Sequence, residues 1–306
     1  MSLEGKINLF GEENYYLKLI GFFIGIIILG ITCYIDDAKG IPSLVKLASQ
    51  VIAAIIVVVC GIRIENISIP FTDGKMVISE IFSYIITICW IVGITNAINL
   101  IDGLDGLSSG VTLISCLSLL IVFSLNPSSP LIAIVLITAL AGAIVGFLPF
   151  NFSPAKTFIG DTGSNFMGFS LAIISILGVA KTYTALVLIA PIIILAMPIF
   201  DTIFAIFRRL IKGKSLKAVF KPDKGHLHHK LMAKGYTQKQ AVLIMYGITA
   251  ILGMFAVILF ESGIWKALSF ALLIIAIVAI GYKDVVMLMS DDKDENIERE
   301  HIRKQD

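Results

Sequence analysis

Apolar runs of about 20 residues recur along almost the whole chain, and they constrain its fold more than any other feature. An α-helix of this length spans the hydrocarbon thickness of a bilayer. The 306-residue chain is 57% hydrophobic and 15% charged, with a mean hydropathy of +0.94, which excludes an ordinary soluble domain. We therefore predict an all-α fold, a polytopic transmembrane helical bundle.

Nine apolar runs predict about nine membrane spans. They cover roughly residues 17–34, 45–61, 80–98, 107–125, 131–149, 165–180, 184–200, 241–260 and 264–282. We predict one membrane-embedded domain over residues 1–282 and a charged cytoplasmic tail over residues 283–306. Between the second and third spans, apolar residues alternate around Pro70 and Gly74, so we expect a small interfacial hairpin within residues 63–79.

The long loop 201–240 sets the predicted orientation. It holds ten lysines and arginines against two acids, Asp201 and Asp223, and loops rich in Lys and Arg stay on the cytoplasmic side. Counting spans outward from this loop places residues 35–44, 99–106 and 150–164 on the same side. The polar motifs of the chain are thus predicted to meet at one face of the membrane.

The end of the third apolar run carries a row of polar residues at intervals of three: Asn96, Asn99, Asp102 and Asp105. Three residues turn a helix by about 300°, so consecutive members are expected to share one broad face. Gly103 and Gly106 each follow an Asp and loosen the backbone. Carboxylates at the mouth of a membrane helix are costly without a partner, so the row indicates a functional site. The alternative is a helix end whose acids simply reach water.

The first loop on this face contains adjacent acids, Asp36 and Asp37, followed by Lys46 at the start of the second span. Neighbours on a helix point about 100° apart, so the two carboxylates cannot chelate one ion symmetrically. One can face a metal or a phosphate while the other is held elsewhere. Lys46 suits a phosphate at the membrane surface, and its alternative is a lysine that only extends to the interface.

Residues 150–164 carry Asn151 and, between glycines, Asp161. Glycines and a helix N-terminus favour the approach of an anion, although this segment could also be a simple helix cap. Carboxylate and amide oxygens are hard ligands that suit Mg²⁺ or Mn²⁺ better than zinc.

The long basic loop ends in three histidines, His226, His228 and His229. They could bind a transition metal, but the lysines around them favour an anion. Together, acids for a divalent ion, bases for a polyanion and a membrane setting match phosphoryl transfer to or from a lipid-borne phosphate.

These motifs resemble those of the polyprenyl-phosphate N-acetylhexosamine-1-phosphate transferases. Asp36-Asp37, the segments NAINLIDGLDGL and NFSPAKTFIGDTGS, PIFD and HLHH occur in the order and spacing of that family, between about Ile31 and Leu231. Phospho-N-acetylmuramoyl-pentapeptide transferase is a relative, and the HLHH form is similar to the N-acetylglucosamine branch. The resemblance implies transfer of a sugar phosphate from a UDP-N-acetylhexosamine such as UDP-N-acetylglucosamine to undecaprenyl phosphate, with release of UMP.

The resemblance also implies roles for individual residues. Asp161 and Asn151 would hold Mg²⁺, with Mn²⁺ as an alternative, and Asp36 and Asp37 would lie near the attacking phosphate. Lys46 would meet the lipid phosphate. Asn99, Asp102 and Asp105 would line the nucleotide site, and His226, His228 and His229 the diphosphate or sugar side. The implied location is the bacterial cell membrane with a cytoplasmic active site. We expect no nucleic-acid partner and consider a homodimer.

The family pattern differs from this sequence at the front. Family members usually have about eleven spans, with a Pro-x-x-Gly-Gly-like motif before the span that ends in Asp-Asp, so two spans are expected to be missing here. The rival hypotheses are a catalytically inactive truncated relative and a transporter of anions or lipid phosphates. A transporter should show repeat symmetry and charges at mid-membrane depth, whereas these acids lie at span ends.

Overall fold

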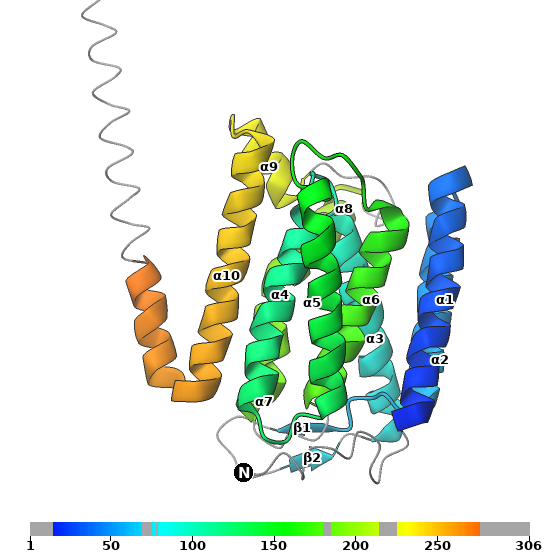
Figure 1. Cartoon of the computed structure of the whole chain (residues 1–306), viewed down its shortest axis with the longest axis vertical. Helices are drawn as coiled ribbons and strands as arrows, with labels where there is room; N and C mark the ends of the chain where they lie inside the picture. Colours follow the sequence, from blue (N-terminus) through cyan, green and yellow to red (C-terminus); the bar gives the residue numbers. More distant parts are fainter. Residues whose placement is uncertain (1–14, 69–74, 78, 180–184, 214–224, 276–306) are drawn as a thin grey trace, which may run out of the picture. The chain divides into compact units, whose positions relative to one another are not determined.

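The computed structural model describes residues 15–68, 75–77, 79–179, 185–213 and 225–275, and these are almost entirely helical (Figure 1). The elements are α1 Tyr15–Lys39, α2 Ser43–Val59, β1 Asn66–Ser68, β2 Lys75–Val77, α3 Glu80–Leu100, α4 Leu107–Leu125, α5 Leu131–Asn151, α6 Gly160–Val179, α7 Ala185–Ile194, α8 Ala196–Gly213, α9 Leu227–Ala233 and α10 Gln238–Ser262. A further apolar helix covers Ile264–Ile275. The predicted all-α class is confirmed for these residues, apart from the short hairpin.

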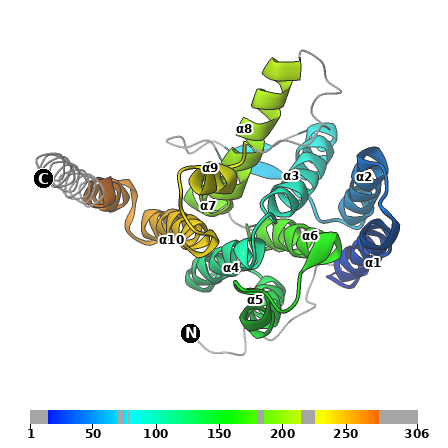
Figure 2. The ribbon, with the colours of Figure 1, turned by 90° about the horizontal axis from the view of Figure 1, so that it is seen from above.

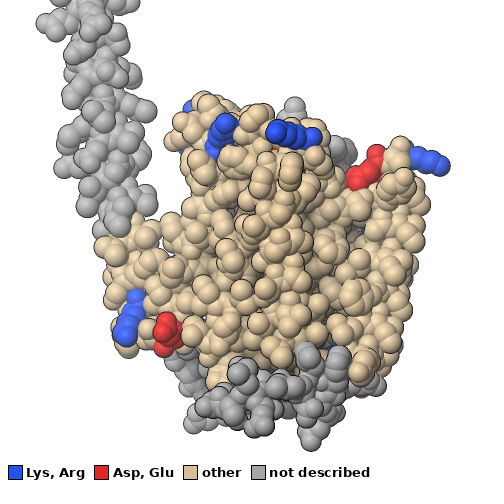
Figure 3. All heavy atoms as spheres, viewed as in Figure 1, with Lys and Arg blue, Asp and Glu red and all other residues tan. Residues whose placement is uncertain are grey.

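Six helices in the described residues are long and apolar enough to cross a membrane: α1, α3, α4, α5, α6 and α10. The helices α2 and Ile264–Ile275 are apolar but shorter. Neither α4 nor α5 contains a charged residue, and the side of the molecule in Figure 3 is uncharged over these helices. Large apolar side chains such as Phe23, Ile27 and Ile31 of α1 are exposed, as expected where lipid is the solvent. Nine spans remain a prediction.

The predicted span 184–200 is divided in the structure. It forms α7 and α8 with a break at Leu195, and α8 continues to Gly213. Pro198 lies in the first turn of α8, where a missing N–H is tolerated, but its ring cannot follow an uninterrupted helix without meeting the preceding turn. The break therefore begins a new helix whose first turns carry Asp201.

The chain divides into two compact units, residues 1–260 and 261–306, and the site described below belongs to the first. The predicted domain boundary at residue 282 and the charged tail 283–306 lie outside the described residues.

The predicted hairpin within residues 63–79 is present as β1 and β2, which pair antiparallel with Ile67 opposite Met76.

Helix α6 is the centre of the first unit. Every residue from Met167 to Val179 is buried, and α6 packs against α1, α3, α4 and α5 (Figure 2). Gly168 permits a close approach of the α6 and α3 backbones, since a Cβ there would lie 2.8 Å from the Thr95 Cα of α3. Phe169 stacks on Phe22 of α1, with ring centroids 6.5 Å apart. The position of α6 therefore sets how these four helices are arranged around it.

The loops that carry the polar motifs lie at one end of this unit. The ends of α1, α3 and α5 and the start of α6 are together, opposite the β1–β2 hairpin (Figure 1). The prediction that these loops share one face of the bundle is thus confirmed, while the assignment of that face to the cytoplasm remains a prediction.

The predicted helical row of polar residues is wrong beyond Asn99. Helix α3 ends at Leu100, and Asp102 and Asp105 lie in the turn before α4. Gly106, with φ +77°, ends that turn in the left-handed region, where glycine is favoured. The acids therefore reach the site from a turn and not from one face of a helix.

Candidate active site

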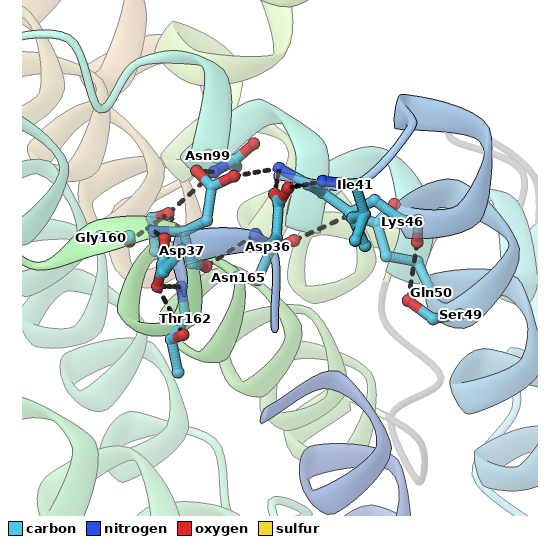
Figure 4. A network of polar contacts seen from close by, with 12 residues as sticks. Asp36, Asp37, Ile41, Lys46, Ser49, Gln50, Asn99, Gly160, Thr162 and Asn165 are labelled. Atoms are coloured by element: carbon cyan, nitrogen blue, oxygen red, sulfur yellow. Dashed lines mark hydrogen bonds and ion pairs between the residues drawn. The ribbon is translucent and has the colours of Figure 1, made fainter. Parts of the chain in front are cut away.

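Asp37 of α1 caps the N-terminus of α6. Its Oδ1 accepts the N–H of Asp161 at 2.9 Å, and its Oδ2 accepts the N–H and the hydroxyl of Thr162 at 3.0 and 2.6 Å (Figure 4). These N–H groups have no partner within the helix, and a carboxylate there also meets the positive end of the helix dipole. Gly160 allows the contact, because a Cβ there would lie 2.9 Å from the Asp37 carboxylate. The predicted segment does form a helix start, but its cap comes from α1.

Asp36, the neighbour of Asp37, faces a different partner. Its Oδ2 lies 2.6 Å from the ammonium of Lys46, and its Oδ1 accepts the N–H of Ile41 at 2.8 Å. The two adjacent acids therefore have different partners, as their angular separation predicted. Asp37 caps α6, and Asp36 pairs with a lysine of α2.

Asp161 connects three helices through its carboxylate. One oxygen contacts the Lys46 ammonium, and the other accepts the side-chain N–H of Asn99 in α3 at 2.8 Å. The same Asn99 nitrogen also lies 2.9 Å from the Ser164 hydroxyl. Lys46 is thus more than a lysine at the membrane interface, and the structure brings together Asp36, Asp37, Lys46, Asn99 and Asp161.

A chain of amide side chains lies behind this cluster. Asn96 donates to Gln50 at 2.6 Å, Gln50 donates to Asn165 at 2.7 Å, and Asn165 donates to the backbone oxygen of Asp161 at 2.8 Å. Gln50 and Asn165 are 1% and 0% exposed, and such buried amides persist because each is hydrogen-bonded. Asn96 stood out in the sequence as part of the polar row, whereas Asn165, four residues after Asp161, was not predicted as part of the site.

Asn151 and Asp105 hold the loop between α5 and α6. The Asn151 side chain accepts the hydroxyl of Ser109 at 2.8 Å and donates to the Thr157 carbonyl at 3.0 Å. Asp105 accepts the N–H of Ala155 at 3.1 Å. Within the described part of the chain no hydrogen bond joins Asn151 to Asp161, so the role of Asn151 as a metal ligand stays a prediction. Its evident role is to shape the loop.

The histidine cluster packs, through His228, on the turn between α3 and α4. Asp201 of α8 accepts Leu227 N–H at 2.8 Å and lies 2.8 Å from His226 Nδ1. This arrangement ties the start of α9 to α8. His228 is 1% exposed and lies over Gly103, where a Cβ would be 2.5 Å from its Nε2. Asp201 was visible in the sequence as the last residue of the PIFD segment and as one of two acids in the basic loop, but no local pattern predicted its pairing with His226.

Burial keeps His228 neutral. Removal from water, assisted by the nearby His229 and His226, lowers its pKa to about 4, because a buried imidazolium is poorly solvated. Its ring lies 4.2 Å from that of His229 and 5.8 Å from that of His226, centroid to centroid. At neutral pH this imidazole therefore offers one N–H donor and one acceptor.

Carboxylates could hold a divalent ion here more readily than histidines. Across the described parts of the chain, no three side chains of His, Cys, Asp or Glu gather as a metal site by themselves. Asp36 and Asp161 already share one cation, the ammonium of Lys46. Their oxygens therefore suit Mg²⁺, which needs few protein ligands and keeps several waters.

Asp102 is held in its turn at an electrostatic cost. Burial raises its pKa to about 6, opposed by a hydrogen bond from Ser108 at 2.6 Å and reinforced by the charges of Asp161 and Asp37. When the pKa of a carboxyl is higher in the folded state than in the unfolded state, its ionisation causes a loss of folding stability. That loss is absent below about pH 4, grows as the pH rises to about 6, and is complete above it.

We therefore predict that Asp102→Asn raises the thermal midpoint in detergent at pH 7.5, by roughly a few degrees, and that this gain shrinks toward pH 4.5. Ser108→Ala, which removes the hydrogen bond to the ionised carboxylate, should lower the midpoint at pH 7.5. Midpoints from intrinsic fluorescence at both pH values test this pair, and an Asp102→Asn protein that is less stable than wild type at pH 7.5 would contradict it.

Comparisons with known proteins identify the family to which this chain belongs. The model of glycosyl transferase family 4 matches residues 19–179, a range that includes Asp36, Asp37, Lys46, Asn99 and Asp161. A probable undecaprenyl-phosphate N-acetylglucosaminyl 1-phosphate transferase of Bacillus subtilis (strain 168) is 42% identical over 272 residues, covering 89% of this chain and 73% of that protein.

Two further relatives have related descriptions. A decaprenyl-phosphate N-acetylglucosaminephosphotransferase of Mycobacterium leprae is 34% identical over 72% of this chain, and the match spans 59% of that protein. A phospho-N-acetylmuramoyl-pentapeptide-transferase of Staphylococcus epidermidis is 32% identical over 79% of this chain and 75% of its own length. The chain therefore belongs to glycosyl transferase family 4 and, within it, to the polyprenyl-phosphate N-acetylhexosamine-1-phosphate transferases whose motifs it carries.

Proposed function

We propose that this chain transfers N-acetylglucosamine-1-phosphate from UDP-N-acetylglucosamine to undecaprenyl phosphate. An oxygen of the lipid phosphate forms a bond to the β-phosphorus of the sugar nucleotide, and the bond from that phosphorus to the bridging oxygen breaks, so UMP leaves. The observation that carries the proposal is the convergence of Asp36, Lys46, Asn99 and Asp161 from four helices at one end of an apolar bundle. The names of the relatives support N-acetylglucosamine as the sugar.

The charges of the cluster suit two phosphate-bearing substrates. Lys46 would bind the lipid phosphate, and Asp161 with Asp36 would hold Mg²⁺; Asn151 remains a candidate ligand. When bound, Mg²⁺ would neutralise the diphosphate and stabilise the charge on the leaving UMP. Asn99 orients Asp161 through its hydrogen bond and would line the nucleotide site with Asp102 and Asp105. His226, His228 and His229 would contact the diphosphate or the sugar.

The reaction needs little help from a general base. A phosphate monoester has its second pKa near ~6 and is mostly a dianion at neutral pH. Asp37 accepts N–H or O–H groups with both oxygens, and Asp36 is paired with Lys46. These contacts favour positioning and electrostatic roles for both acids over covalent attack.

The membrane arrangement is part of the proposal. Nine spans, with residues 17–34 as the first, would put the polar end of the bundle and the ten bases of the loop 201–240 in the cytoplasm. There the site would meet a soluble UDP-sugar and an acceptor in the inner leaflet of the bacterial cell membrane. Such a reaction begins the synthesis of a cell-envelope polysaccharide, of the teichoic acid or lipopolysaccharide kind. A homodimer is compatible with this arrangement.

The first test is UMP release by the purified protein with UDP-N-acetylglucosamine, undecaprenyl phosphate and Mg²⁺. We expect Asp161→Asn to lower turnover by on the order of 100-fold or more, because the lost charge serves both the metal and Lys46. Glu80→Gln is the matched control, since this exposed carboxylate pairs with Arg63 away from the site, and it should keep wild-type turnover. Wild-type turnover by Asp161→Asn would refute the role of Asp161.

The second test separates direct attack from a covalent aspartyl intermediate. An enzyme with such an intermediate would exchange labelled UMP into UDP-N-acetylglucosamine without any lipid acceptor. Since both carboxylates of Asp36 and Asp37 are already paired, we expect exchange only when undecaprenyl phosphate is present. Label entering the sugar nucleotide in lipid-free protein, with a rate comparable to turnover, would show double displacement instead.

A further inference from the structure

Lys46 occupies a place that a metal ion could take. It lies in the first turn of α2, and its ammonium contacts Oδ2 of Asp36 and Oδ2 of Asp161 (Figure 4). Its side chain is 17% exposed, against 12% for Asp36 and 34% for Asp161. One cation is therefore held between two carboxylates that come from different helices, α1 and α6.

The remaining oxygens of this carboxylate pair are committed to N–H donors. Oδ1 of Asp36 accepts Ile41 N–H at 2.8 Å, and Oδ1 of Asp161 accepts the Asn99 side-chain N–H at 2.8 Å. These bonds orient each carboxylate so that its second oxygen points to the shared cation. The backbone of Asp161 is fixed in turn by Asp37. The two helices thus hold a preformed cation position, and a flexible lysine fills it.

We propose that Lys46 and a divalent cation are alternative occupants of the position between Asp36 and Asp161. A metal ion and an ammonium cannot share the two oxygens, because like charges at this distance repel and each needs the same lone pairs. Metal binding would therefore release the ammonium. The inference rests on the proposed function, since that function requires the divalent ion.

The exchange would change the charge of the site without any proton transfer. Two carboxylates and one ammonium carry a net charge of about −1, whereas the same groups with a divalent ion carry about +1. A site of the first kind repels phosphates, and a site of the second kind attracts them. The released lysine would also be free to bind the lipid phosphate. Divalent cation would therefore be expected to bind before either phosphate-bearing substrate.

The test measures Mn²⁺ binding to the full chain in detergent, without nucleotide or lipid, from the EPR signal of free Mn²⁺. The relevant site is the one that Asp161→Asn removes. We expect Lys46→Met to bind Mn²⁺ at this site at least about 10-fold more tightly than wild type, a change of roughly 1.4 kcal/mol. Lys39→Met is the matched control, because Lys39 is exposed in the last turn of the same helix as Asp36, and its affinity should stay within about twofold of wild type.

A second measurement uses wild-type protein, so it does not depend on the folding of a variant. Lysine acylation followed by mass spectrometry reports how free each ammonium is. Mg²⁺ should increase the labelling rate of Lys46 several-fold and leave that of Lys39 unchanged. Unaltered Lys46 labelling on saturation with Mg²⁺ would overturn the exchange, as would Mn²⁺ affinity in Lys46→Met that equals or falls below that of wild type.

The outcomes also separate this inference from the proposed function. UMP release together with an unaltered Lys46 labelling rate would reject the exchange of cations alone and leave the proposed sugar-phosphate transfer intact. A wild-type protein without an Asp161-dependent Mn²⁺ site would overturn the exchange together with the metal assignment. Absence of UMP release, with the exchange observed, would reject the transfer and keep the cation site.

Discussion

The hydrogen bonds from the first turn of α6 to Asp37 are the interaction on which the rest of the site depends. Helix α6 is the buried centre of its unit, and its N-terminus would otherwise leave N–H groups without partners. Asp37 supplies acceptors for Asp161 and Thr162 from a separate helix. Because one of these donors is the backbone of Asp161, the contact that closes the helix also sets the position of the acid proposed to act in catalysis.

The paired charges explain why acids persist at this end of an apolar bundle. Asp36 and Asp161 share Lys46, and Asn99 satisfies the oxygen of Asp161 that Lys46 does not contact. A carboxylate that is partly removed from water is tolerated when it is paired and hydrogen-bonded. The same pairing keeps the oxygens oriented toward one cation position, so the stabilising contacts and the proposed chemistry use the same groups.

The sequence predicted the general arrangement well, because membrane helices and local angles follow from simple rules. Apolar length located most helices, and the 100° between neighbours anticipated the separate partners of Asp36 and Asp37. The helical row from Asn96 to Asp105 failed because α3 ends at Leu100 and the chain then enters a turn, which Gly106 closes with a φ of +77°. Contacts such as Lys46 with Asp161, 115 residues apart, or Asn151 with Ser109, depend on tertiary packing that no local pattern encodes.

Amide hydrogen exchange over the first turn of α6 tests the central claim most directly. If Asp37 caps this helix, the N–H groups of Asp161 and Thr162 should be protected in wild-type protein and should exchange at least about 10-fold faster in Asp37→Ala, as loss of a helix cap implies. The last turn of α5 serves as the internal reference and should be unchanged. Equal exchange at Asp161 and Thr162 in both proteins would contradict the account.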